Sequence, residues 1–176
     1  SMGAVFAVYF AAAEARAKLN ALTSLLLLNP WVADTGKVGP GTMLGLLVGG
    51  LRGSAKPYAV AGGPDVMTTN PEATRMLESD PLWVRAESAA FLYQIGLKMR
   101  GGVIRQARDV RVPTLVLQAE RDRAVVPAAT RRCYDALGTS EKVWKTLPEY
   151  AHDSELEADR TALDDEIARW LLSHRA

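Results

Sequence analysis

The sequence has one cysteine, two histidines and a net charge of +1 over 176 residues. A single cysteine, Cys133, cannot form an intrachain disulfide, so nothing requires an oxidising compartment and we expect a cytoplasmic protein. The 21 basic residues are scattered among 20 acidic ones without the basic stripe of nucleic-acid-binding proteins, so no nucleic-acid partner is expected. Apolar runs fall short of the roughly 18 to 20 residues that cross a bilayer, and no transmembrane segment is predicted.

The hydrophobic content of 48% excludes intrinsic disorder and favours one ordinary globular domain. No Cys/His cluster or glycine-rich phosphate loop is present, so neither a metal nor an organic cofactor is expected. Acidic residues cluster from Asp153 to Glu166, and we interpret this run as the solvated face of a helix.

Three short stretches are predicted as β-strands. Leu22–Leu28 and Pro113–Ala119 are apolar without regular alternation, which is typical of strands covered on both faces in parallel sheets. Val143–Leu147 is shorter and more polar, which favours an edge position.

Helical patterns separate these strands. The alanine-rich stretch Gly3–Lys18 is apolar on nearly all sides and is predicted as a buried helix. Pro127–Leu137 begins with a helix-starting proline and stops before a glycine, and Asp159–His174 repeats apolar residues at helical spacing. This alternation of strands and helices predicts an α/β fold with parallel pairing.

The middle of the chain differs from its ends. Residues 33–108 are predicted as a helical cap, inserted between core segments 1–32 and 109–176 and roofing an active site. Helices are expected at Pro71–Glu78 and Leu82–Met99. The apolar segment Met43–Leu51 either lines a channel for an acyl chain or is a simple buried helix.

His152 and Asp122 are the candidates for acid–base chemistry. Each follows a predicted parallel strand, so both emerge at the carboxyl edge of the sheet, where a carboxylate can orient an imidazole. Two alternatives stay open: His152 is a satisfied loop or core histidine, and Asp122 closes a turn or pairs with Arg121 or Arg123. The other histidine, His174, lies close to the C-terminus, where precise positioning is difficult.

The chain opens with Ser1, Met2 and Gly3, and this start resembles a motif of the α/β-hydrolase family. Ser1, Met2 and Gly3 are similar to the last three residues of the family's Gly-x-Ser-x-Gly nucleophile elbow, and a helix rich in small residues follows. The order serine, aspartate, histidine matches the family, with 30 residues between Asp122 and His152. A leading Ser-Met also arises when an affinity tag is removed, and this alternative stays open.

The resemblance is closer to serine hydrolases of the monoacylglycerol-lipase kind. VPTLVLQAERDRAVVP resembles their acid strand and loop, and LPEYAHDSELEADR resembles their histidine loop. The resemblance implies that Ser1 is the nucleophile and His152 the general base. It also implies that Asp122 orients His152 and that the Met2 N–H is an oxyanion-hole donor. The implied reaction cleaves carboxylic esters, such as monoacylglycerols or lysophospholipids. A thioesterase, a peptidase or a non-catalytic binding subunit is the alternative.

In this family the nucleophile follows the fifth strand, whereas here it stands at the first residue. The chain thus resembles the C-terminal half of an α/β hydrolase, with about three parallel strands, flanking helices and a cap. We expect the N-terminal half to accompany it as a separate or cleaved polypeptide, unless the chain is incomplete.

Overall fold

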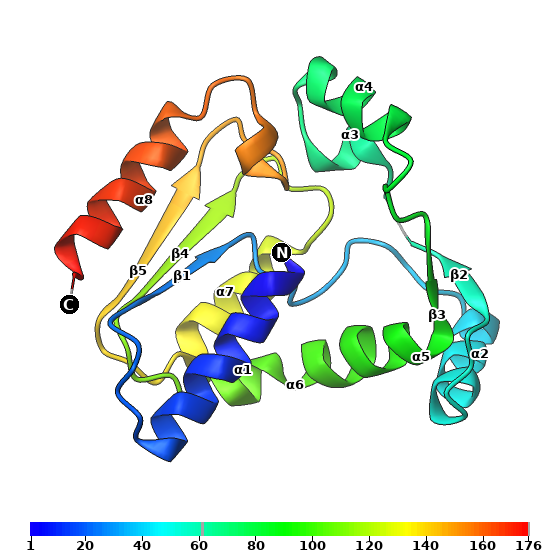
Figure 1. The fold of residues 1–176 in the computed structure, drawn as a ribbon, viewed down its shortest axis with the longest axis horizontal. Helices are drawn as coiled ribbons and strands as arrows, with labels where there is room; N and C mark the ends of the chain where they lie inside the picture. The colour runs from blue at the N-terminus through cyan, green and yellow to red at the C-terminus, as the bar shows by residue number, and fades with distance from the viewer. Residues whose placement is uncertain (61, 176) are drawn as a thin grey trace.

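A three-stranded parallel sheet forms the centre of the fold (Figure 1). The computed structural model describes residues 1–60 and 62–175. Its strands lie in the order β1 (Leu25–Leu28), β4 (Thr114–Ala119) and β5 (Lys142–Leu147). The predicted parallel α/β sheet, with the third strand at an edge, is confirmed.

Strand β1 begins three residues later than predicted because a buried carboxylate captures the backbone before it. Glu14 Oε1 accepts hydrogen bonds from the N–H groups of Ala21 (2.5 Å) and Leu22 (3.4 Å). Those donors therefore bind a side chain instead of a neighbouring strand, and the ladder starts at Leu25, opposite Thr114.

Helices cover both faces of the sheet. Side chains of β4 alternate between two apolar clusters, with Val116 in one and Leu115 and Leu117 in the other. The first cluster includes side chains of three helices, and the second includes side chains of one. These helices are α1 (Met2–Ala17), α6 (Arg100–Ala107) and α7 (Pro127–Ala136) on the first face, and α8 (Thr161–Ser173) on the second.

Helix α1 forms as predicted, but the expectation that it is buried on nearly all sides is wrong. Val5 and Val8 are buried in the first cluster, whereas Phe6 and Phe10 are 43% and 60% exposed. Within the described residues, α1 packs mainly on β1 and α6, which cover only one side of it. The lone Cys133 is buried in the same cluster, and burial raises the pKa of its thiol to about 11.

The segment between β1 and α6 is mainly helical. Helix α4 confirms the helix predicted at Pro71–Glu78, but the helix predicted over Leu82–Met99 is wrong in its first part, because Ala86–Ser88 pairs with Pro57–Ala59 in an antiparallel ribbon. The elements of this segment are α2 (Pro40–Leu51), β2 (Pro57–Ala59), α3 (Pro64–Met67), α4 (Pro71–Ser79), β3 (Ala86–Ser88), α5 (Ala89–Phe91) and the π-helix η1 (Leu92–Met99). None of the helices described here is long and apolar enough to span a bilayer.

Helix α2 is not the simple buried helix that its composition allowed. Only Leu46 and Gly50 are buried, while Leu44 and Leu51 are exposed. A Cβ at Gly50 would lie 2.1 Å from the Cβ of Tyr93, so the glycine permits the close approach of α2 to η1.

Candidate active site

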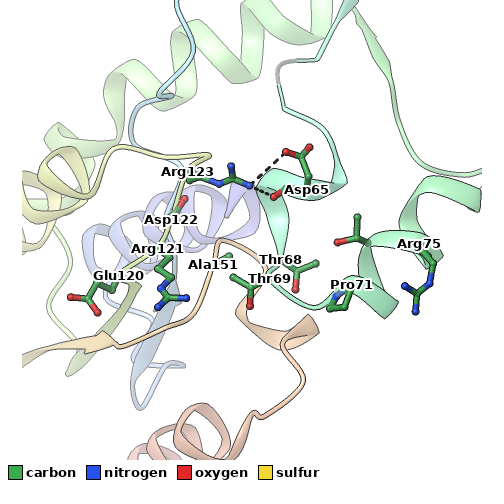
Figure 2. Close-up of a pocket in the computed structure, with 11 residues that line it drawn as sticks. Asp65, Thr68, Thr69, Pro71, Arg75, Glu120, Arg121, Asp122, Arg123 and Ala151 are labelled. Atoms are coloured by element: carbon green, nitrogen blue, oxygen red, sulfur yellow. Dashed lines mark hydrogen bonds and ion pairs between the residues drawn. The ribbon is translucent and has the colours of Figure 1, made fainter.

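In the loop after β4, Asp122 stands between two arginines that form ion pairs with other carboxylates. Arg121 forms an ion pair with Glu149, and Arg123 pairs with Asp65 at 3.6 Å. Figure 2 shows these arginines beside an open hollow of about 800 Å³, bordered on its other side by residues 65–75. The arginines bind other carboxylates, so the alternative that either one pairs with Asp122 is wrong.

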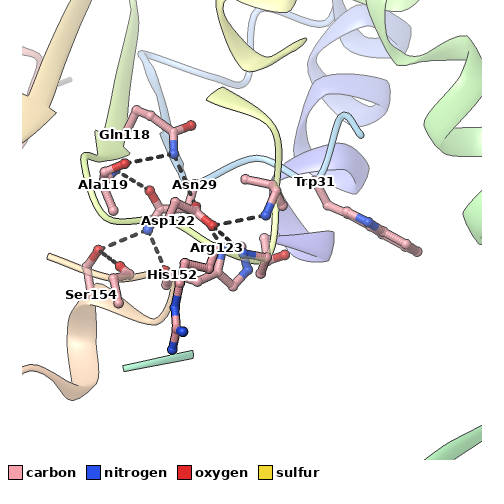
Figure 3. Close-up of polar contacts among 12 residues, drawn as sticks. Asn29, Trp31, Gln118, Ala119, Asp122, Arg123, His152 and Ser154 are labelled. Atoms are coloured by element: carbon pink, nitrogen blue, oxygen red, sulfur yellow. Dashed lines mark hydrogen bonds and ion pairs between the residues drawn. The ribbon is translucent and has the colours of Figure 1, made fainter. Parts of the chain in front are cut away.

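Asp122 and His152 meet at the carboxyl edge of the sheet (Figure 3). The parallel register ends β4 at Ala119 opposite Leu147 of β5, so the loops that follow the two strands emerge side by side. His152 Nδ1 lies 2.9 Å from Asp122 Oδ2, and their side chains are 4% and 0% exposed. The expected pairing of these two residues is confirmed as geometry.

The Asp122 carboxylate is held by four hydrogen bonds. Oδ1 accepts from the N–H groups of Ala124 and Val125 (both 2.9 Å), and Oδ2 accepts from Gln118 Nε2 (3.1 Å) as well as from His152. Burial alone would raise the pKa of Asp122, but the hydrogen bonds together outweigh it and lower that pKa. Asp122 therefore both closes its turn and hydrogen-bonds to the histidine ring.

This arrangement sets the tautomer of His152. An ionised carboxylate only accepts hydrogen bonds. The Nδ1 of His152 therefore carries a proton, and this N–H donates a hydrogen bond to Asp122. In the neutral ring, Nε2 is then an acceptor that can take a proton from another group. The second histidine, His174, lies at the opposite end of the sheet, where its Nε2 binds Glu141 (3.0 Å) just before β5.

Ser1 stands at the N-terminus of α1, next to the end of β1. Its backbone nitrogen donates to the Leu28 carbonyl (3.0 Å), and its carbonyl accepts from the N–H groups of Ala4 and Trp31. Ser1 is the N-cap residue of α1, but its side chain makes no capping hydrogen bond. In the described residues the Ser1 and His152 side chains are not hydrogen-bonded, although both line one cavity.

This cavity has a volume of about 360 Å³ and is mainly apolar. Ser1, Met2 and His152 border it on the sheet side. The segment between β1 and α6 supplies most of its apolar lining, including Met43, Leu46, Met67, Val84, Phe91 and Leu97. The Met43–Leu51 segment therefore contributes two side chains to a cavity, as one of its two interpretations predicted.

Asn29 is a residue of this site that sequence reasoning missed. Its Nδ2 donates to the His152 carbonyl and to Ser154 Oγ (2.9 Å), and its Oδ1 accepts from the Ala119 N–H (2.7 Å). Asn29 is fully buried, so one side chain ties together the ends of β1, β4 and the histidine loop. The only signal for this role in the sequence is the position of Asn29 at the end of an apolar strand. That position is equally typical of a residue that simply ends a strand.

We expect Asn29→Ala to lower the free energy of unfolding by about 3 kcal/mol, because it leaves buried partners unsatisfied and places alanine at a left-handed φ of 44°. Urea unfolding measures this loss. Asn20→Ala is the matched control, because Asn20 is also left-handed (φ 53°) but exposed. Equal losses in both variants would mean that backbone strain, not the Asn29 hydrogen bonds, causes the effect.

The sequence matches the family described as serine aminopeptidase, S33, over residues 1–159. The chain belongs to this α/β-hydrolase family. The fold agrees, since a monoacylglycerol lipase structure from Paleococcus ferrophilus superposes with a TM-score of 0.82 at 18% identity, covering 96% of this chain and 65% of the other. A soluble variant of monoglyceride lipase from Saccharomyces cerevisiae gives 0.80 at 16% identity, covering 100% and 60%.

This α/β hydrolase also matches a monoacylglycerol lipase from Mycolicibacterium smegmatis with 21% identity over 110 residues. The match covers 62% of the chain and 39% of that lipase, so the aligned stretch spans about two fifths of the relative's length. The resemblance to monoacylglycerol-lipase-like α/β hydrolases that the motifs carried is confirmed.

Proposed function

We propose that the chain is the catalytic C-terminal half of a serine hydrolase that cleaves carboxylic esters through a Ser1–His152–Asp122 triad. The observation that carries this proposal is the buried His152–Asp122 pair, which borders the same apolar cavity as Ser1. The shared cavity supports a role for His152 as the base and for Asp122 as the orienting acid of a nucleophile at Ser1.

In this mechanism Ser1 Oγ attacks the ester carbonyl while His152 Nε2 takes the hydroxyl proton. The tetrahedral intermediate collapses, its C–O bond breaks, and His152 returns the proton to the leaving alcohol. Water then attacks the acyl-enzyme, again losing a proton to His152, and the acid leaves as Ser1 regains its hydroxyl. Asp122 holds the imidazole in place and stabilises its charged form throughout.

Met2 supplies one oxyanion-hole donor in this proposal. Its backbone N–H lies in the first turn of the 16-residue helix α1, where N–H groups have no intrahelical acceptor. The positive end of the helix dipole also favours negative charge at this position. Met2 lines the same cavity as Ser1, which supports this role for its N–H.

The cavity supports the proposed substrate class. An apolar space of about 360 Å³ suits an acyl chain, and we propose a monoacylglycerol, a lysophospholipid or a similar acyl ester. We propose that residues 33–108 form a cap over this cavity, since they supply most of its apolar lining. A thioester or peptide bond is open to the same triad, and turnover of matched substrates distinguishes the three.

We further propose that an N-terminal half of the hydrolase packs on β1 and α1. The chain covers 60% to 65% of the solved lipases it superposes on, and in the described residues β1 pairs only with β4. The exposed Phe6 and Phe10 offer an apolar surface beside it. This half would supply the second oxyanion donor. We also propose that the hydrolase is located in the cytoplasm.

A fluorophosphonate probe tests the proposal on the assembled hydrolase, meaning this chain together with its N-terminal half. We expect the probe to attach to Ser1 in a one-to-one ratio by mass spectrometry, with p-nitrophenyl ester hydrolysis lost in parallel. Ser1→Ala is the matched control and should not be labelled. An intact assembled protein that neither reacts with the probe nor hydrolyses esters would instead favour a binding subunit.

A further inference from the structure

Glu157 is the most deeply buried carboxylate of the acidic run Asp153–Glu166. Glu155, Asp159, Asp164 and Asp165 are exposed as the interpretation of this run predicted. Glu157, by contrast, is only 9% exposed and lies between the histidine loop and the cap. The interpretation of the whole run as a solvated face is wrong at this position, and a buried carboxylate requires specific partners.

Glu157 joins two segments that are far apart in the sequence. Its Oε1 accepts hydrogen bonds from the N–H groups of Ala151 and Thr69 (both 3.0 Å), and its Oε2 accepts from Thr69 Oγ1. Ala151 directly precedes His152, and Thr69 belongs to the cap between α3 and α4. One carboxylate thus fastens the cap to the residue next to the histidine.

Further contacts hold the same two segments together. The Asp153 N–H donates to the Met67 carbonyl (2.6 Å), and the Leu156 carbonyl accepts from Asn70 Nδ2 (3.0 Å). Residues 67–70 therefore bind the histidine loop at Asp153 and Leu156, between His152 and Glu157. A displacement of this part of the cap acts directly on the loop that carries His152.

The cap segment also touches the cavity. Met67 lines the space that we assign to the acyl chain, two residues before Thr69. An acyl chain that fills the cavity therefore contacts residues 67–70, the segment to which Glu157 is hydrogen-bonded. An ester with a short acyl group fills less of that space.

We propose that Glu157 is a positioning residue, which couples filling of the acyl cavity to the placement of His152 against Ser1. The proposal rests on the ester hydrolase function proposed above. With a long acyl chain bound, the cap segment is fixed, and through Glu157 and Ala151 it fixes the histidine. Without Glu157 the acyl chain still binds, but its binding no longer orders the base.

The test compares Glu157→Ala with Glu157→Gln in the assembled hydrolase, using p-nitrophenyl acetate and p-nitrophenyl decanoate. For Glu157→Ala we expect kcat on decanoate to fall about a hundredfold, as for a misplaced catalytic group, while KM stays nearly constant. Its kcat on acetate should fall far less, so the preference for the long chain disappears. Glu155→Ala, in the same loop but exposed, is the control that keeps wild-type values.

Glu157→Gln separates positioning from charge. The glutamine oxygen can accept from both N–H groups, and its amide can donate to the Thr69 hydroxyl, so we expect most of the decanoate kcat to return. If Glu157→Ala does not fold, Thr69→Val tests the coupling instead, because it removes only the hydrogen bond from the Thr69 hydroxyl to Glu157. It should lower decanoate kcat selectively, and Thr69→Ser should restore it.

Two results would overturn the coupling. One is an equal fall of kcat on acetate and decanoate in Glu157→Ala, or in Thr69→Val where the alanine variant does not fold. The other is a glutamine variant as impaired as the alanine variant. A wild-type protein that the fluorophosphonate probe does not label would refute the hydrolase function itself. Labelled wild-type protein with an unchanged chain-length preference in the variants would refute only the coupling.

Discussion

Replacing His152 by alanine is expected to lower ester kcat in the assembled hydrolase by about a millionfold, close to the loss of all triad function. Without the imidazole, no group takes the Ser1 hydroxyl proton, and a neutral hydroxyl is a poor nucleophile. Steady-state hydrolysis of p-nitrophenyl decanoate measures the loss. The substitution removes the ring's bond to Asp122 but keeps the backbone carbonyl that Asn29 binds, so the circular dichroism spectrum should stay native.

His174→Ala is the matched control for this prediction, since it removes the other histidine of the chain. Its ring stacks on Trp170 with centroids 3.8 Å apart and binds Glu141, at the sheet end away from the cavity. We expect kcat of this variant to equal that of the wild type. Substantial ester turnover by folded His152→Ala protein would rule out the proposed mechanism.

Asp122→Asn is expected to lower kcat by about ten-thousandfold. The asparagine amide lacks the charge that stabilises the imidazolium, and its NH₂ group would face the donors that now point at the carboxylate. If that NH₂ group faced the ring, it would favour the tautomer with its proton on Nε2, the atom that must act as base. The same ester assay measures the effect, with Asp165→Asn, an exposed position on α8, as control. A loss of less than tenfold would contradict an orienting role for Asp122.

The same substitution has a pH-dependent effect on stability. The pKa of Asp122 is lowered by folding, so ionised Asp122 stabilises the native state above its unfolded pKa of about 3.9. That stabilisation is lost as pH falls through the lower pKa of the folded state. Urea unfolding should therefore show a gap between wild type and Asp122→Asn at pH 6 that narrows below pH 4. A gap that widens in acid would contradict the lowered pKa.

Sequence patterns were sufficient for the α/β class and for the pairing of Asp122 with His152. Runs such as Pro113–Ala119 are apolar on both faces, which local composition reveals, and all six residues of β4 are buried. Parallel strands end at a common edge, so residues that follow β4 and β5 had to meet without any knowledge of side-chain packing. The division into a core and a cap at residues 33–108 stays a prediction, as do the catalytic roles.

Tertiary structure decided what depends on distant atoms. Strand β1 starts later than predicted because Glu14 binds the backbone before it. Residues Ala86–Ser88 were predicted as helix but pair with β2. Asn29 binds His152 across 123 residues, and Glu157 binds Thr69 across 88. The sequence by itself determined the strands and helices of the parallel core and the sheet edge where Asp122 and His152 meet, because periodicity and strand direction are local properties. Which polar side chains hold that site together was set only by folding, because a buried hydrogen bond is defined by partners that the chain brings together from afar.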